Sequence, residues 1–216
     1  ARLLQMLSAR FLMEGRFDQA AQVGVEAIAV ARAVGEVEAE FRAHNILAPS
    51  LVHVGRVDEG LAALETARGL AGDVPRRLVG YYINASDALH LLGRYAEAAQ
   101  IAREGLDRAR EIGLARGHGA MVAGNTAEPL LALGEWDEAE RLITRALDLD
   151  PPVRHVWHLL TLRAWLSTWR GDLDDAALSL DEARSRMTRR QPGPQYELPL
   201  VRAGAELSLA RGDADA

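Results

Sequence analysis

Residues 93–105 read Gly-Arg-Tyr-Ala-Glu-Ala-Ala-Gln-Ile-Ala-Arg-Glu-Gly, a turn glycine followed by a helix that keeps small residues at fixed offsets. The pattern returns along the chain with a period close to forty residues, because the turn glycines are separated by 40, 38, 41, 37 and 41 positions. Self-similarity at a fixed period of this length indicates a solenoid of stacked units. The turn glycines are Gly15, Gly55, Gly93, Gly134, Gly171 and Gly212.

Each unit is predicted to be a first helix, a turn at the glycine and a second helix. Glycine can take the left-handed backbone that ends the first helix. Offsets of five and twelve differ by two helical turns, so small residues at those offsets share one face and let helices approach closely. One hairpin cannot bury such a face alone, so stability must come from stacking unit on unit. The small residues are Ala20, Gly60, Ala98, Ala139 and Ala176 at five after the glycine, Ala27, Ala67, Gly105, Ala146 and Ala183 at twelve after, and Ser8, Ala48, Ser86, Ala127, Ala164 and Ala205 at seven before.

The segment Gly134-Glu135-Trp136-Asp137-Glu138-Ala139, followed by Ala146 and Pro151, resembles the tetratricopeptide repeat (TPR). The units of this chain are longer than the ~34 residues of that family. Extended repeats of this kind, residues 115–150 above all, are similar to those of the large ATP-dependent LuxR-type (MalT-like) transcriptional regulators. The resemblance implies an all-α, right-handed α-solenoid of antiparallel helical hairpins. It also implies a nucleotide-switching domain upstream and a helix-turn-helix DNA-binding domain downstream.

The unbroken period favours a single superhelical domain over residues 1–216. The chain starts without methionine and stops just after a turn glycine, so we expect it to be a fragment of a longer chain. The stretch 189–194, with two prolines and a glycine, is the one clear loop, and a final helix at about 195–211 lacks its partner. The expected repeats are about 1–35, 36–74, 75–114, 115–151 and 152–190, with a partial one at 191–216.

Composition excludes several classes of function. There is no cysteine, which excludes disulfides and thiolate metal sites. All 25 basic residues are arginine, and a Walker phosphate loop needs a lysine. Net charge −6 and pI of about 5.6 argue against a nucleic-acid surface. No apolar run approaches the ~18 residues of a membrane span, and nothing at the start resembles a signal peptide, so we expect a cytoplasmic protein.

Polar residues recur on the first helices, which line the concave groove in TPR-like solenoids. Asn84 and Asn125 both lie nine residues before their turn glycines, and Asp87 and Glu128 both lie six before. Two adjacent repeats therefore present the same Asn-x-x-acid pattern on one helical face. An asparagine can bind a peptide backbone or a polar small molecule, or it can bond to a neighbouring helix. Asn45 lies ten before Gly55, with Arg42 one turn earlier.

Two prolines, Pro49 and Pro129, fall inside first helices. Proline removes an amide donor and frees the carbonyl four residues earlier, here that of Asn45 or Asn125. The freed carbonyls would either be offered to a ligand in the groove or accompany a kink that sets the curvature of the superhelix.

Aromatic and histidine side chains add to the expected groove. Trp165 and Trp169 are four apart, and with Trp157, His158 and Thr161 they would form an aromatic-polar wall, or else part of the core. His53 and His90 could approach across adjacent repeats, but two ligands make a poor metal site, so no metal is expected. The full set of groove candidates is Arg42, Asn45, Asn84, Asp87, His90, Asn125, Glu128, His158, Trp165 and Trp169.

No catalytic motif is present, so the sequence predicts non-catalytic recognition without a cofactor. One hypothesis is an effector-sensing module, which would bind a small molecule, a partner protein or other domains of the same regulator. The other is a peptide-docking adaptor unrelated to transcription. Arg42 and Arg2 are the arginines at groove positions and both lie beside acids, which disfavours a strongly acidic ligand.

Overall fold

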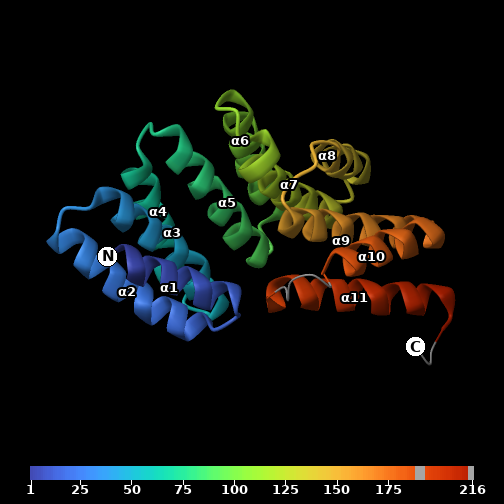
Figure 1. Cartoon of the computed structure of the whole chain (residues 1–216), viewed down its shortest axis with the longest axis horizontal. Coiled ribbons are helices and arrows are strands. Elements are labelled where there is room, and N and C mark those ends of the chain that lie inside the picture. The colour runs from blue at the N-terminus through green and yellow to red at the C-terminus, as the bar shows by residue number, and fades with distance from the viewer. Residues whose placement is uncertain (188–192, 214–216) are drawn as a thin grey trace.

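The computed structural model describes residues 1–187 and 193–213, and within these ranges the chain consists of helices and short turns without a β-strand (Figure 1). The expected loop therefore lies mostly outside the described residues, as do Arg189 and Arg190. Within the described ranges, no helix is long and apolar enough to cross a bilayer.

Helical hairpins follow one another along the chain as the period predicts. The fourth unit differs in starting with a short π-helical segment, η1, which runs directly into its first α-helix. The helices are α1 (Arg2–Met13), α2 (Phe17–Ala33), α3 (Val37–His53), α4 (Val57–Ala71), α5 (Pro75–Leu91), α6 (Tyr95–Glu111), η1 (Ala115–Gly119), α7 (Ala120–Leu133), α8 (Trp136–Asp148), α9 (Val153–Arg170), α10 (Leu173–Met187) and α11 (Pro194–Arg211).

The turn glycines do what the sequence predicts. All six have positive φ, between 71° at Gly15 and 84° at Gly171. At Gly93 the chain closes with bonds from the Arg94 amide to the Leu89 carbonyl (2.9 Å) and from the Gly93 amide to the His90 carbonyl (2.9 Å). These bonds satisfy carbonyls that the end of α5 would otherwise leave without a donor.

The small residues at the three predicted offsets are buried with one exception. Ala20, Ala98 and Ala139 have no exposed surface, and Gly105 of α6 is also buried. A β-carbon at Gly105 would lie 2.5 Å from Cβ of Tyr82 on α5, so only glycine fits there. Ala205 of α11 is exposed, because no second helix follows it among the described residues.

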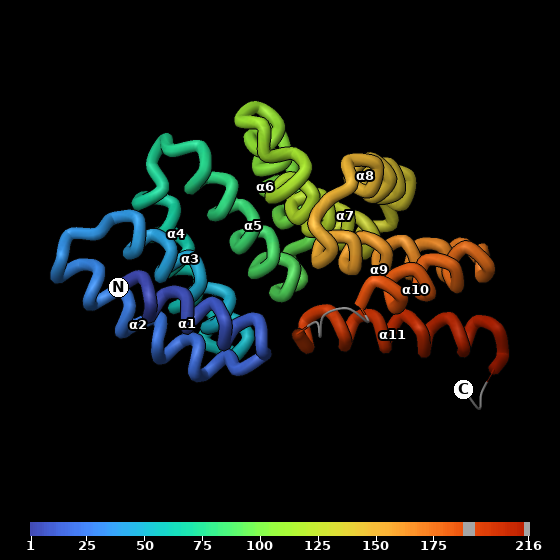
Figure 2. The backbone as a smooth tube through the Cα atoms, viewed as in Figure 1, coloured from blue at the N-terminus to red at the C-terminus, as the bar shows by residue number. Residues whose placement is uncertain are grey.

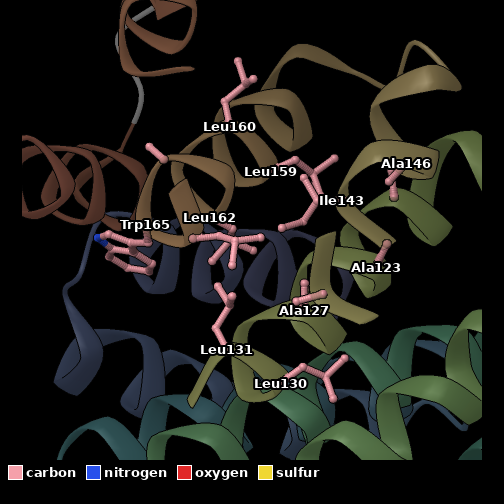
Figure 3. Packing of buried hydrophobic residues seen from close by; sticks show 14 of the residues in the cluster. Ala123, Ala127, Leu130, Leu131, Ile143, Ala146, Leu159, Leu160, Leu162 and Trp165 are labelled. Atoms are coloured by element: carbon pink, nitrogen blue, oxygen red, sulfur yellow. The ribbon is translucent and has the colours of Figure 1, made fainter. Parts of the chain in front are cut away.

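The hairpins stack so that the first helices form one continuous layer. Each of α1, α3, α5, α7 and α9 contacts the first helix of the next unit, and each second helix contacts the first helices of its own unit and of the next. The largest hydrophobic cluster includes buried residues of helices from α5 to α11. Figure 3 shows part of it, where Leu159 of α9, which is fully buried, lies beside Ile143 of α8. All the groove candidates lie on the layer of first helices.

The stack curves strongly, so that the end of α1 lies beside the start of α11 (Figure 2). A β-carbon added to Gly193 would be 2.6 Å from the carbonyl oxygen of Met13. The sequence gives no measure of this curvature, which accumulates over all the units.

Two glycine-to-alanine substitutions test the close approach of the helices. We expect Gly105→Ala to lower the free energy of unfolding by about 1–3 kcal/mol, because the new methyl group overlaps Tyr82. Gly69→Ala, at an exposed position of α4 with nothing within 4 Å, should raise it by about 0.5–1 kcal/mol. Urea denaturation of both variants measures the difference, and equal effects would contradict the packing described here.

Candidate functional site

Four of the predicted groove residues form a cluster where α5, α7 and α9 lie side by side. Glu128 of α7 lies between two histidines, with its carboxylate oxygens 3.8 Å from Nε2 of His90 on α5 and 3.8 Å from Nε2 of His158 on α9. These are ion-pair distances, longer than hydrogen bonds. Asp87, one turn before His90, is the second carboxylate. We call Asp87, His90, Glu128 and His158 the carboxylate–histidine cluster.

Local sequence explains how the histidines reach Glu128. Gly124 lies one turn before Glu128, and a β-carbon there would be 2.6 Å from Nδ1 of His158. The missing side chain therefore makes room for the imidazole. The His90 ring packs against Tyr95 with ring centroids 5.1 Å apart, and its Nδ1 is buried without a hydrogen-bond partner among the described residues.

The two carboxylates of the cluster have opposite pKa shifts. Burial alone would raise the pKa of Glu128, but the polar contact with His158 and the charges of His158, His90 and Arg202 hold it below its usual value. Burial, together with the negative charge of Glu128, raises the pKa of Asp87 to about 7. Glu128 is thus ionised at neutral pH, whereas Asp87 is close to its titration point.

The cluster is still accessible. The side chains of both histidines are 23% exposed and that of Glu128 is 30% exposed, so a bound molecule could reach them. In the described part of the chain, no group of three or more acidic, histidine or cysteine side chains is arranged to hold a metal ion. An ionised carboxylate flanked by imidazoles suits a ligand that offers hydrogen-bond donors or a positive charge.

The predicted tryptophan wall is mostly core. Trp157 and Trp165 are only 5% and 8% exposed, because α11 covers this part of α9. Trp165 stacks on Trp169 (6.3 Å between ring centroids, planes 1° apart), and Trp169 is 39% exposed. Arg202 of α11 lies over the Trp165 ring at 5.2 Å, and Glu206 accepts a hydrogen bond from Nε1 of Trp169 (3.1 Å). Of the three tryptophans predicted for the wall, Trp169 is the exposed one.

The asparagines bond to neighbouring helices, the alternative stated above. Nδ2 of Asn45 donates to the Gly80 carbonyl (2.9 Å), and Nδ2 of Asn125 donates to the Ile83 carbonyl (3.0 Å). Asn45 and Asn125 are 7% and 9% exposed.

The structure contradicts one of the two alternatives stated for Pro49, that of a carbonyl offered to a ligand. Nδ2 of Asn84 donates to the Asn45 carbonyl (2.7 Å), the group that Pro49 leaves without its helical donor. The asparagine of one unit therefore offsets the proline of the preceding one, and this carbonyl is not offered to a ligand.

The remaining candidates lie apart from the cluster. Arg42 is exposed and pairs with Glu38 (2.7 Å), as expected for an arginine beside acids. His53 stacks on Phe17 at 3.8 Å, while His90 lies against Glu128, so the two histidines have different neighbours.

Sequence reasoning missed Arg202 and Glu206, although a signal was present. Glu206 lies six residues before Gly212, the offset shared by Asp87 and Glu128 before their own turn glycines. Extending the offset to the unpaired last helix would have found it.

No protein-family model and no curated protein matches the sequence. Among solved structures, the chain is similar to the crystal structure of BtubC (BKLC) from P. vanneervenii, with a TM-score of 0.69 and 17% sequence identity over 92% of this chain and 88% of that chain. The likeness is one of fold. At this identity it carries no information on ligand or activity.

A double-mutant cycle tests the link between Asn84 and Pro49. Asn84→Ala should lower the free energy of unfolding by about 1–2 kcal/mol, because it leaves the Asn45 carbonyl without a donor. In a Pro49→Ala background the amide of residue 49 can bond that carbonyl, so the same substitution should cost about 1 kcal/mol less. Additive effects in urea denaturation would show that the bond does not compensate for the proline.

The pKa of Asp87 predicts a pH-dependent stability. The pKa of an aspartate in the unfolded chain is ~4. Between that pH and about pH 7 only the folded state keeps the proton on Asp87, so the free energy of unfolding falls as pH rises. Asp87→Asn removes this loss. It should stabilise the protein by about 1–2 kcal/mol at pH 8, allowing for solvent screening, and have little effect at pH 4.5.

Urea titrations from pH 4.5 to 8 measure this gain. In a Glu128→Gln background the gain at pH 8 should be smaller, because one cause of the raised pKa is gone. A gain independent of pH would contradict the assignment.

Proposed function

We propose that this chain is a non-catalytic recognition module, a TPR-like, right-handed superhelix that binds its partner on the layer of first helices. Following the sequence resemblance, it is the effector- or partner-sensing region of a bacterial LuxR-type transcriptional regulator and acts in the cytoplasm. Its ligand is a small-molecule effector, a protein segment or another domain of the regulator. Binding shifts the regulator between inactive and active assemblies.

The observation that carries the proposal is the carboxylate–histidine cluster. Its members come from three consecutive hairpins: His90 and His158 lie 3.8 Å from Glu128, and the charges of Glu128 and His158 act on Asp87. Buried polar groups are normally tied by hydrogen bonds, as the asparagines are. Glu128 has no bond of hydrogen-bond length to either histidine, and it keeps nearly a third of its side-chain surface exposed. A ligand with donor or cationic groups would complete these contacts.

A peptide-docking adaptor without a role in transcription is the second candidate. The spread of the cluster over α5, α7 and α9 favours it, because an extended peptide can cross several first helices. Both candidates place the ligand at the same residues, and they differ in whether it is a small molecule or a chain.

Binding screens on wild type and on Asp87→Asn/Glu128→Gln test the site. A peptide library and a metabolite panel read by thermal shift should yield ligands with basic or donor-rich groups, which bind the variant at least about tenfold more weakly. The control, Asp58→Asn/Glu59→Gln, removes two exposed acids of α4 and should bind as wild type does.

The outcomes separate the candidates. Hits confined to the metabolite panel favour the effector sensor, and hits confined to peptides favour the adaptor. Ligands that bind both variants equally would show that the cluster is not the site. Enrichment of acidic peptides would contradict the expected polarity of the ligand.

A further inference from the structure

A cleft of about 310 Å³ lies on the outer surface between the second helices α6 and α8. Four arginines line it, Arg103 and Arg110 from α6 and Arg141 and Arg145 from α8. We call it the arginine cleft. It belongs to the opposite layer from the carboxylate–histidine cluster, and the function proposed above makes no use of it.

The charges of the arginine cleft do not balance. Two carboxylates line it, so four arginines minus two acids leave an excess of two positive charges. Both acids already have partners. Glu138 accepts two hydrogen bonds from Arg103 (2.9 and 2.8 Å), and Asp107 accepts one from Arg110 (3.0 Å).

Arg141 and Arg145 carry the excess. They lie four residues apart on α8 and so one turn apart on the same helical face, a spacing at which like charges destabilise a helix. Neither has an acid within ion-pair distance of 4.0 Å in the described part of the chain. The whole chain has net charge −6, so a local excess of positive charge is the opposite of what the composition predicts.

A second cleft, which also has α8 in its lining, provides a comparison. It lies where α8, α9 and α10 meet and measures about 330 Å³, but its two arginines face three acids. Both arginines are paired there, Arg170 with Glu140 (2.7 Å) and Arg163 with Glu182 (3.6 Å). Of the two clefts, only the arginine cleft is lined by arginines that have no acid within 4.0 Å in the described part of the chain. Arg68, Arg76 and Arg154 also lack such a partner, but they line neither cleft.

We propose that the arginine cleft binds a phosphate monoester. The dianion matches the excess of two positive charges, and the planar guanidinium fork binds phosphate oxygens in pairs. Leu106 and Leu142 also line the cleft and give it an apolar wall. The organic part of the ligand lies on these leucines, while Arg141 and Arg145 hold the phosphate.

Phenyl phosphate is the probe, because it joins a dianion to an apolar ring. Calorimetric titration at pH 7.5 and low salt should show binding that weakens as salt is added. Arg141→Gln/Arg145→Gln should weaken it by about tenfold or more. The matched control, Arg10→Gln/Arg56→Gln, removes two exposed arginines that pair with glutamates elsewhere and should bind as wild type does.

Three results with phenyl phosphate and inorganic phosphate would overturn the proposal. The first is that wild type does not bind phenyl phosphate at millimolar concentration. The second is that both double variants weaken binding equally. The third is that inorganic phosphate binds as tightly as phenyl phosphate, because the leucines would then contribute nothing. A phosphotyrosine peptide and adenosine monophosphate then distinguish a modified protein from a nucleotide as the source of the monoester. Loss of binding to both would also count against the site.

Discussion

Close approach of helices at small residues is the constraint on which the rest of this structure depends. Because Ala98 has only a methyl side chain and Gly105 has none, α6 packs closely on the first helices α5 and α7. This contact, repeated at each unit, keeps the first helices in one layer. Glu128 can reach histidines on both sides only because α5, α7 and α9 are neighbours in that layer. The candidate site is thus a consequence of how the hairpins pack.

The polar side chains in the layer of first helices fall into two groups. Asn84 and Asn125 each donate to a carbonyl of another first helix, and Asn84 compensates for the donor that Pro49 lacks. Such bonds fix the position of one unit on the next. Glu128 and its histidines lie at longer distances and keep exposed surface. The difference in bonding separates residues that hold the stack together from residues that remain available to a ligand.

The sequence was sufficient for features set by local spacing and insufficient for those set by stacking. The turn glycines follow from offsets within one unit, and the structure confirms their positive φ. The contact of Gly193 with Met13 depends on curvature summed over every unit. The direction in which Asn84 bonds depends on the offset between two units. No sequence pattern within one unit specifies the curvature of the stack or the offset between two units.

The two candidate binding surfaces share one structural element, the hairpin of α7 and α8. Glu128 lies on α7 in the inner layer, and Arg141 lies on α8 in the outer layer. The same hairpin is tied to its predecessor by the bidentate pair of Arg103 and Glu138, at the wall of the arginine cleft. A ligand that favours one packing of this hairpin on α5 and α6 would change the geometry of both surfaces. Coupling between two such ligands would then be reciprocal, because each acts on the same equilibrium.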